Sequence, residues 1–285
     1  MGIKMPKTSV ALGMFDGVHL GHLKVINAAL SKKNLMSAAF TFKSLRNIEN
    51  ITPHQAKFEL LKKTGIEIVY SSDFDGIKDL SADEFVVDVL VNQLNCAHVS
   101  CGKNFRFSQN AAANARDLQQ LCRPFNIEVT IVGTAEMGDE RISSTRIRKE
   151  IKVGNVHSVS KMLGRELSYS LEVVEGAKLG RVIDFPTINQ VIPSSCVLPK
   201  FGVYKSRTIV GNVSYPSLTN IGIKPTVVAL IETPQIIMET HILDFTLDLY
   251  GQSIEVALLD FIREEQKFDS LDALKEQIQN DVRKI

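Results

Sequence analysis

The order of apolar and helical segments in the N-terminal half is the feature that most constrains the fold. Short apolar runs over residues 10–12, 37–42, 66–70, 97–101 and 127–132 are separated by longer stretches with helical periodicity. Strands that alternate with helices form parallel, doubly wound sheets. We therefore expect an α/β domain whose ligands bind at the carboxyl ends of the strands.

Start and stop signals locate the helices between these strands. Helical periods cover residues 23–30, 52–63, 115–122 and 156–163. Ser81 and Glu84 have capping-box spacing before a further apolar face, so another helix is expected to start there.

The pattern changes after Leu167, where short β-rich runs alternate with turns rich in Gly, Pro and Asn. The runs cover residues 168–174, 201–210, 236–245 and 253–259, and predict a small closed β-barrel. Ser270 is a candidate N-cap for a final amphipathic helix over residues 271–282. The expected domains are residues 1–159 and 160–285.

The overall composition and charge do not indicate a function, so the function has to be inferred from local sites. The chain has 285 residues, 44% of them hydrophobic and 23% charged, with a formal net charge of +1, so bulk charge favours neither nucleic acid nor an anionic membrane as a partner. No apolar run approaches the ~18–20 residues that span a bilayer, so a cytoplasmic protein is expected. Cys96, His98 and Cys101 lack a second ligand pair, which disfavours a zinc site.

The segment S-V-A-L-G-M-F-D-G-V-H-L-G-H, residues 9–22, is a strand, a glycine turn and the start of a helix. His19 and His22 stand three residues apart, so both imidazoles are expected on one helical face beside backbone N–H groups without intrahelical partners. Such a corner suits a polyphosphate. A pair of solvated histidines beside a turn is the alternative.

A second phosphate-binding pattern is R-I-S-S-T-R-I-R, residues 141–148. Ser144 and Thr145 are expected to cap a helix with nearby arginines, which would satisfy N–H groups and bind phosphate oxygens together. A plain N-cap explains one hydroxyl but neither Arg141 nor Arg146.

Three strings stand out in the C-terminal half: G-A-K-L-G-R-V-I-D-F-P-T-I-N at 176–189, N-I-G-I-K-P-T at 220–226 and M-E-T-H-I-L-D-F-T-L-D-L-Y-G at 238–251. A G-x-x-x-x-G-K-[ST] loop does not occur, so a kinase here would not use a Walker site. Taken singly, Thr187 and Asn189 are compatible with turn residues and Glu239 with an exposed strand residue.

Together these strings resemble the bacterial bifunctional riboflavin kinase/FAD synthetases, whose first half is an FMN adenylyltransferase of the nucleotidylyltransferase group. The resemblance implies that the HxGH histidines bind triphosphate and stabilise the transition state. The residues it assigns to catalysis in the first half are His19, His22, Arg141, Ser144 and Thr145. Those it assigns to nucleotide and flavin binding there are Gly13, Phe15, Asp16, Gly17, Asn104, Arg146 and Arg148.

The same resemblance implies a kinase site in the barrel. Thr187 and Asn189 would bind Mg²⁺, for which hard oxygen ligands are suited, and Glu239 would act as general base. The residues expected around the nucleotide are Gly176, Lys178, Gly180, Arg181, Phe185 and Pro186.

The expected function is phosphorylation of riboflavin to FMN and adenylylation of FMN to FAD, with ATP as co-substrate of both steps and Mg²⁺ as cofactor. Several segments depart from the family pattern. Ser108 and Asp184 replace family glycines, residues 43–46 and 109–115 are altered, and the loop over residues 227–237 is longer. These changes leave two alternatives open: a riboflavin kinase with a weakened adenylyltransferase half, and a flavin- or nucleotide-binding regulator without turnover.

Overall fold

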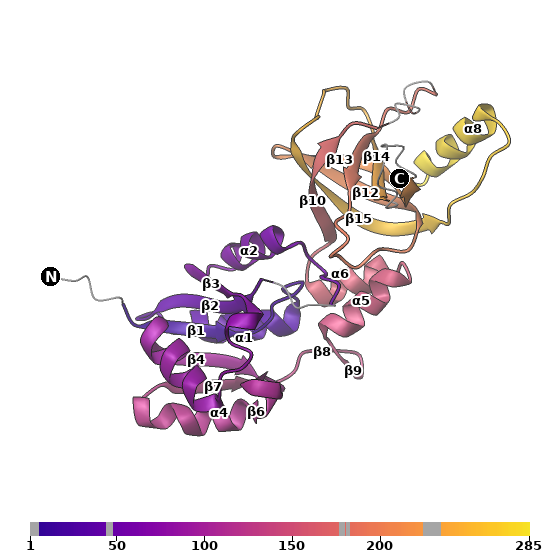
Figure 1. Ribbon diagram of the computed structural model, residues 1–285. Coiled ribbons are helices and arrows are strands. Elements are labelled where there is room, and N and C mark those ends of the chain that lie inside the picture. The colour runs from indigo at the N-terminus through magenta and orange to yellow at the C-terminus, as the bar shows by residue number, and fades with distance from the viewer. Residues whose placement is uncertain (1–5, 44–47, 177–179, 181–182, 225–234) are drawn as a thin grey trace. The chain divides into compact units, whose positions relative to one another are not determined.

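The computed structural model describes residues 6–43, 48–176, 180, 183–224 and 235–285. Lys178 and Arg181, two of the residues expected at the kinase site, therefore lie outside the described residues. The chain forms two compact units, which divide between Ser144 and Thr145 (Figure 1).

The first unit contains the expected parallel sheet. Its five strands are β1 (Thr8–Leu12), β2 (Met36–Phe42), β3 (Ile68–Ser72), β4 (Cys96–Gly102) and β7 (Glu128–Val132), in the order β3-β2-β1-β4-β7. All four pairings are parallel, with β1 at the centre. Because β1 and β4 are parallel neighbours, their carboxyl ends meet at the same edge of the sheet.

Helices pack on both faces of this sheet, as the doubly wound prediction requires. The helices are α1 (Leu20–Leu30), α2 (His54–Lys63), α3 (Ala82–Glu84) continuing as the π-helix η2 (Phe85–Gln93), and α4 (Ala115–Cys122). Strand β1 sends Val10 and Leu12 into the core under η2 and α4, and Ala11 into the core under α1 and α2. The alternating side chains of one central strand thus stabilise two separate cores.

Short elements connect the layers. They are η1 (Phe74–Gly76), β5 (Arg106–Phe107), η3 (Gln109–Ala111), β6 (Ala113–Asn114), η4 (Arg123–Phe125), β8 (Glu136–Met137) and β9 (Glu140–Arg141). Strands β5 and β6 form an antiparallel hairpin, and Phe105 stacks on Phe107 with ring centroids 5.7 Å apart. The segment after β4 is therefore an aromatic hairpin.

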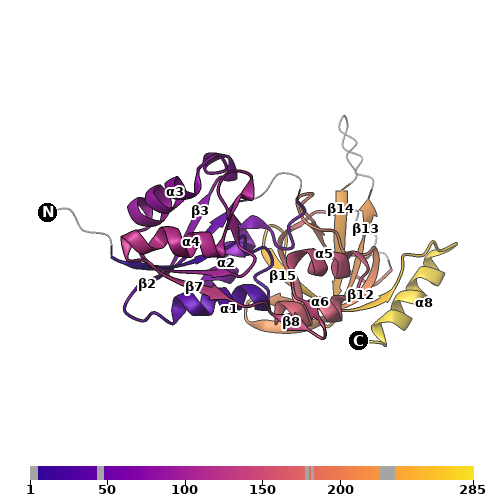
Figure 2. The same cartoon turned by 90° about the horizontal axis from the view of Figure 1, so that it is seen from below.

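The second unit is a closed six-stranded barrel, also as predicted (Figure 2). Its strands are β10 (Leu167–Val174), β11 (Ile188–Val191), β12 (Gly202–Val210), β13 (Val213–Lys224), β14 (Gln235–Ile242) and β15 (Ser253–Arg263), closed in the order β10-β11-β14-β13-β12-β15. Helix α5 (Ser144–Lys152) leads into α6 (Val156–Leu163), which packs on β10 and β15.

The barrel interior contains a network of buried hydroxyls. Ser206 lies 2.8 Å from both Ser217 and Thr219, and Thr219 lies 2.9 Å from Thr240, measured between side-chain oxygens. All four residues are buried. Serine and threonine therefore occupy inward positions that aliphatic residues fill in most barrels.

The C-terminal helix α8 (Leu271–Val282) begins at the predicted cap, since the Ser270 hydroxyl accepts the N–H of Ala273 at 3.2 Å. Asp281 near its end is fully buried. Its carboxylate accepts hydrogen bonds from Arg263 Nε at 2.7 Å and Gln277 Nε2 at 3.0 Å. This contact joins the helix to the end of β15.

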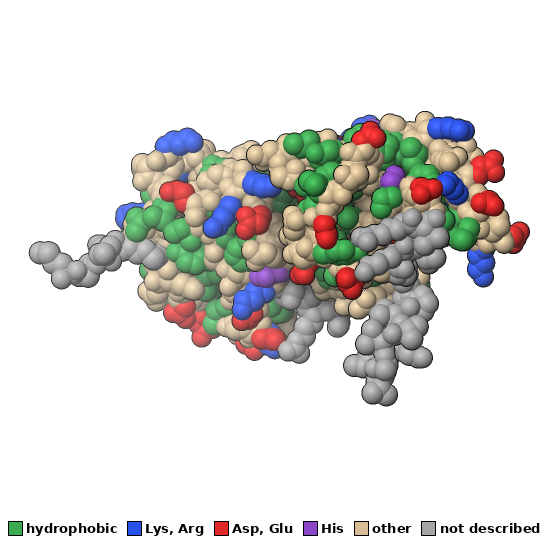
Figure 3. Space-filling view, turned by 90° about the horizontal axis from the view of Figure 1, so that it is seen from above, with side chains coloured by type: hydrophobic (Ala, Val, Ile, Leu, Met, Phe, Trp, Pro, Cys, Tyr) green, Lys and Arg blue, Asp and Glu red, His purple; other side chains and the backbone are tan. Residues whose placement is uncertain are grey.

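The surface carries charges of both signs. Acidic and basic side chains are interspersed on the face that Figure 3 shows, in keeping with the net charge of +1. Among the described residues, no helix is long and apolar enough to cross a membrane.

Candidate active sites

The turn after β1 places two imidazoles in direct contact. The rings of His19 and His22 stack with centroids 3.6 Å apart and an interplanar angle of 14°. His19 is the N-cap of α1, and its Nδ1 accepts the backbone N–H of His22 at 3.2 Å. The first histidine therefore satisfies one orphan N–H of the helix itself, which the sequence did not indicate.

Three positive φ angles shape this turn. Phe15 has φ +50°, Gly17 has φ +80° and Val18 has φ +40°. Only glycine adopts such angles without strain, and strained backbone is concentrated at functional sites. The ring of Phe15 has no exposed surface and packs edge-to-face on His22 at 5.4 Å, so it supports the imidazole from the core side.

Gly21 provides space for the histidine stack. A Cβ at this position would lie 3.0 Å from Cε1 and 3.1 Å from Nδ1 of His19. Any larger residue between the two histidines would press on the capping ring, which explains the glycine in H-L-G-H.

His22 combines burial with nearby positive charge. Its Nδ1 is buried and has no hydrogen-bond partner within the described part of the chain. Burial lowers the pKa of His22 well below its ordinary value, and the charges of His19, Lys57 and Arg141 lower it further. A neutral imidazole surrounded by cationic groups is suited to an incoming anion.

Asp16 and Ser144 hold the turn in place. Asp16 is buried, and its Oδ1 accepts the N–H groups of Ile51 at 2.8 Å and Thr52 at 3.4 Å. The Ser144 hydroxyl donates to the backbone carbonyl of Asp16 at 3.1 Å. The histidine turn is thus anchored to the segment before α2 and to the first residue of α5.

The expected cap of α5 needs a correction. The helix begins at Ser144, so Ser144 and Thr145 are its first two residues and Ser143 occupies the preceding cap position. The hydroxyl of Ser144 is used in the bond to Asp16 instead. Thr145, Arg146 and Arg148 follow on α5, beyond the division between the two units, and their roles stay predictions.

Lys57 is a charged group that sequence reasoning missed. It lies on α2 with 4% of its surface exposed, and its ammonium donates to Phe42 O at 2.5 Å, Thr41 Oγ1 at 3.3 Å and Met14 O at 3.4 Å. Burial lowers its pKa to about 8, while the charge of Asp16 acts to raise it. A lysine on the apolar side of a helical period gives a sequence signal, but only the fold shows that its ammonium reaches β2 and the turn after β1.

In the barrel, the register of three strands brings the kinase candidates together. Asn189 on β11 is the pairing partner of Glu239 on β14, and Asn220 on β13 pairs with Glu239 from the other side. Paired residues of antiparallel strands project from the same face with Cβ atoms ~4.5–5.5 Å apart. The candidate base therefore lies between two asparagines.

Close backbone approach surrounds Asn189. A Cβ at Gly176 would lie 2.3 Å from Asn189 Nδ2, so only glycine fits there. Asn189 is buried, and its Oδ1 has no hydrogen-bond partner among the residues that the structure describes. A Cβ at Gly180 would lie 2.3 Å from the carbonyl oxygen of Phe185 and 3.4 Å from Thr187 Oγ1.

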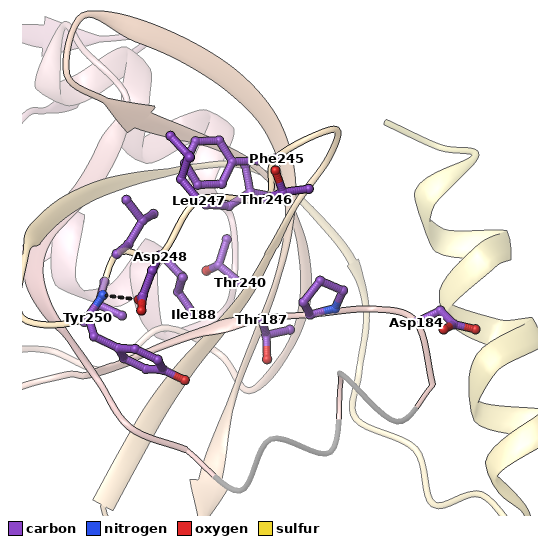
Figure 4. A pocket seen from close by; sticks show the side chains of 13 residues that line it. Asp184, Thr187, Ile188, Thr240, Phe245, Thr246, Leu247, Asp248 and Tyr250 are labelled. Carbon is purple, nitrogen blue, oxygen red and sulfur yellow. Dashed lines mark hydrogen bonds between the residues drawn. The ribbon is translucent and has the colours of Figure 1, made fainter.

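A cavity of about 550 Å³ opens beside Thr187 and Pro186 (Figure 4). Its walls include Thr240 from β14 and the segment from Phe245 to Tyr250, where Asp248 Oδ1 accepts the N–H of Tyr250 at 3.0 Å. The lining combines apolar side chains with a few polar groups, as is typical of small-molecule sites, and it does not include Asn189 or Glu239.

Both halves of the chain match known enzyme families. Residues 3–146 match the FAD synthetase family model, and residues 163–285 match the riboflavin kinase family model. A bifunctional riboflavin kinase/FMN adenylyltransferase of Listeria monocytogenes is 32% identical, over 95% of this chain and 89% of the relative. That of Escherichia coli is 33% identical, over 95% and 90%. This chain belongs to the bifunctional riboflavin kinase/FMN adenylyltransferase family.

A solved structure supports the same fold. The crystal structure of a macrolide-efflux protein from Streptococcus pneumoniae superposes with a TM-score of 0.86 at 32% identity, covering 99% of this chain and 94% of the other. The family resemblance predicted from the motifs is thereby confirmed for both halves, and the chain is an enzyme with FAD synthetase and riboflavin kinase domains.

At two positions where the family has glycine, this chain has another residue but keeps a positive φ angle. Ser108 has φ +68° and Asp184 has φ +64°. Ser108 has ψ 176°, a combination that is essentially restricted to glycine and costs another residue of order 1–3 kcal/mol. The cost at Asp184 is smaller, because an Asp side chain can compensate locally for a positive φ. Asp184 also forms an ion pair with Lys275 of α8, at 2.5 Å. The local conformation therefore survives both replacements.

The remaining expected site residues lie at loops of the first unit. Gly13 follows β1 and donates its N–H to Phe40 O at 3.2 Å. Asn104 is exposed in the loop after β4, and Arg141 is exposed on β9.

The thiols of Cys96 and Cys101 are buried, which raises the pKa of each to about 12, so neither is a thiolate at neutral pH.

Proposed function

We propose that the barrel unit transfers the γ-phosphoryl group of ATP to the terminal hydroxyl of riboflavin, and that the N-terminal unit then joins FMN to the AMP portion of a second ATP. The observation that carries this proposal is the register pairing of Asn189 with Glu239. It puts a carboxylate that can accept a proton beside an amide oxygen that can hold a phosphate-bound cation.

In the kinase step, Glu239 accepts the proton of the riboflavin hydroxyl as the oxygen attacks phosphorus. A positioned general base contributes typically ~10²–10⁴ to a rate. The glycines at 176 and 180 let the backbone approach Asn189 and Thr187 closely, which favours wrapping of the nucleotide phosphates. Positioning of this kind carries most of the catalysis in phosphoryl transfer.

The donor set fits Mg²⁺. The buried Oδ1 of Asn189 and the hydroxyl of Thr187 are hard oxygen ligands, and Gly176 leaves no side chain between the loop and Asn189. When bound with ATP, the ion would neutralise phosphate charge. Thr187 and Asn189 would hold it in place.

In the adenylyl transfer, the FMN phosphate attacks the α-phosphorus of ATP and pyrophosphate leaves. The stacked His19 and His22 would stabilise the charge that develops on the leaving group, and Arg141 would add to the positive potential. The predicted contacts of Thr145, Arg146 and Arg148 with phosphate belong to the same step.

Other predictions accompany this function. We propose that the protein acts in the cytoplasm, that its partners are riboflavin, FMN, FAD and ATP rather than nucleic acid or membrane, and that the functional domains are residues 1–159 and 160–285. The names of the relatives favour the bifunctional reading over the kinase-only and non-catalytic alternatives.

The deciding experiment is product analysis. The pure protein is incubated with riboflavin, ATP and Mg²⁺, and FMN and FAD are separated by chromatography. We expect FMN first and FAD later. FMN without FAD at saturating ATP would favour the kinase-only alternative, and neither product would favour the non-catalytic one.

A further inference from the structure

A row of polar side chains continues past Glu239 on one face of the barrel. The paired residues Asn189, Glu239 and Asn220 form this row across strands β11, β14 and β13. Along β14, Met238 and Thr240 are buried whereas Glu239 and His241 are partly exposed. The row therefore lies on the outer face, opposite the hydroxyl network of the interior.

Glu265 extends the row by one carboxylate. Asn220 Nδ2 donates to Glu265 Oε1 at 3.2 Å. A Cβ at Gly222, two residues along β13, would lie 2.1 Å from that same oxygen. The carboxylate thus rests directly against the strand backbone, and the glycine provides the space it occupies.

The other three neighbours of Glu239 on this face do not extend the row, because each either has another role or is apolar. Asn189 belongs to the metal and phosphate end. His241, the next outward residue on β14, donates from Nδ1 to Pro186 O at 2.8 Å and packs on Phe185 at 5.2 Å. Ile237, on the opposite side along the strand, is apolar. Among the described residues, polar groups thus continue the row only through Asn220 and Glu265.

We propose that Asn220 and Glu265 bind the polyol chain of the acceptor substrate and so determine its specificity. The inference rests on the kinase function proposed above, in which Glu239 contacts the terminal hydroxyl. Neighbouring strands lie ~4.7–4.9 Å apart, a step that about four C–C bonds of an extended polyol span. A carboxylate accepts hydrogen bonds from hydroxyls and an amide both donates and accepts, so the pair suits successive hydroxyl groups.

The test compares two flavins that differ in the polyol. Riboflavin carries it, and lumiflavin has the same ring system with a methyl group instead. Binding of each to the full-length protein is measured by quenching of flavin fluorescence. For Glu265→Gln and Asn220→Ala we expect riboflavin affinity to fall roughly 10-fold or more, as for loss of a hydrogen bond to a charged group, with lumiflavin affinity unchanged.

Two further variants sharpen the test. Gly222→Ala should push the intact carboxylate away and reproduce the selective loss for riboflavin. Glu264→Gln, which alters the neighbouring carboxylate that pairs with Lys200 at 2.8 Å, should leave both affinities unchanged. Retained lumiflavin binding shows that each variant is folded.

The inference is overturned if Glu265→Gln and Gly222→Ala leave riboflavin affinity unchanged, or if both flavins lose affinity equally. Failure of the kinase function is seen separately, because the unaltered protein would then form no FMN from riboflavin, ATP and Mg²⁺.

Discussion

At the residue scale, the stacked imidazoles combine an observed structural role with a proposed chemical one. His19 caps α1, so its removal would affect both the helix and the site. Nδ1 of His22 has no hydrogen-bond partner among the described residues, which makes His22 the cleaner position for testing chemistry.

His22→Ala should reduce the rate of FAD formation by roughly 10²–10³, as for loss of one donor to a developing oxyanion, and leave FMN formation unchanged. Because burial keeps the free imidazole neutral, a bound triphosphate should raise its pKa, so ATP binding should take up a proton. Calorimetry in buffers of different ionisation enthalpy measures this uptake. His157→Ala, at an exposed position on α6, serves as control. Unchanged FAD formation would remove His22 from the mechanism.

Glu239→Gln keeps the shape of the side chain and removes its basicity. FMN formation should fall by roughly 10²–10⁴, with flavin affinity retained. Single-turnover measurements of FMN formation check the rate. Glu172→Gln, at an exposed position on β10, should keep the normal rate. A rate equal to that control would show that Glu239 is not the base.

His98, which belongs to neither candidate site, should make the stability of the protein depend on pH. The Ser9 hydroxyl donates to Ala29 O at 2.8 Å, so it accepts from His98 Nδ1 at 2.7 Å, and Nε2 then accepts from Thr130 Oγ1 at 2.9 Å. A neutral ring with its proton on Nδ1 satisfies this network. Burial lowers the pKa of His98, helped by Lys32 and opposed by Glu128.

The unfolded chain therefore binds more protons than the folded one just below the ordinary histidine pKa of ~6.5. The stability that His98 contributes is present above that pH and is lost as the pH falls towards the lowered pKa. Hydrogen exchange of β1 and β4 amides at pH 7.5 and 5.5 measures this loss. His98→Gln should show a smaller loss, and an equal one would contradict the assignment.

At the element scale, amphipathic helices were predictable and polar strands were not. The helices α4, α6 and α8 have the predicted bounds because an apolar period and a cap coincide at each. The prediction missed β13, whose inward residues include Ser217 and Thr219, because buried hydroxyls remove the alternation of hydrophobicity. The helix that starts after Ser81 was predicted with its capping box, but its continuation as the π-helix η2 was not, since a π-helical period leaves no local signal.

The same contrast holds for the sites. Motif strings indicated His19, His22, Asn189 and Glu239, because the candidate phosphate-binding residues cluster in the sequence. Lys57, Asn220 and Glu265 depend on strand register and on which backbone a side chain meets. No string of neighbouring residues contains that information.

Helix α8 supplies an element-scale prediction. Asp281→Ala leaves Arg263 without its carboxylate partner, and breaking such a buried pair costs ~3–5 kcal/mol. The thermal midpoint of the barrel should fall and α8 amides should exchange faster. Ser270→Ala removes only the N-cap hydrogen bond of α8, which should lower the free energy of unfolding by ~1 kcal/mol. The effect of Asp281→Ala is compared with this smaller effect. Equal effects of the two variants would show that Asp281 does not anchor the helix.

At the scale of the whole molecule, each half carries its own candidate phosphate-binding residues, so the two activities should be separable. A fragment of residues 145–285 should form FMN and no FAD. A fragment of residues 160–285 loses Val156 and Val159, two buried residues of α6, each worth ~1.5–3 kcal/mol of burial.

The shorter fragment should therefore form FMN but unfold at a lower temperature. Circular dichroism and the FMN assay compare the two. If the folded 145–285 fragment binds riboflavin without forming FMN, the kinase activity depends on the N-terminal half.

Closure of the barrel has a consequence for how the chain would misassemble. Each of the six barrel strands pairs with a strand on both sides, so the described part of the barrel has no edge strand. The five-stranded sheet ends at β3 and β7, each of which has a strand on one side only. Aggregates formed under mild destabilisation should therefore grow by strand addition at β3 or β7, and peptides that copy these two strands should inhibit their growth more than peptides copied from the barrel.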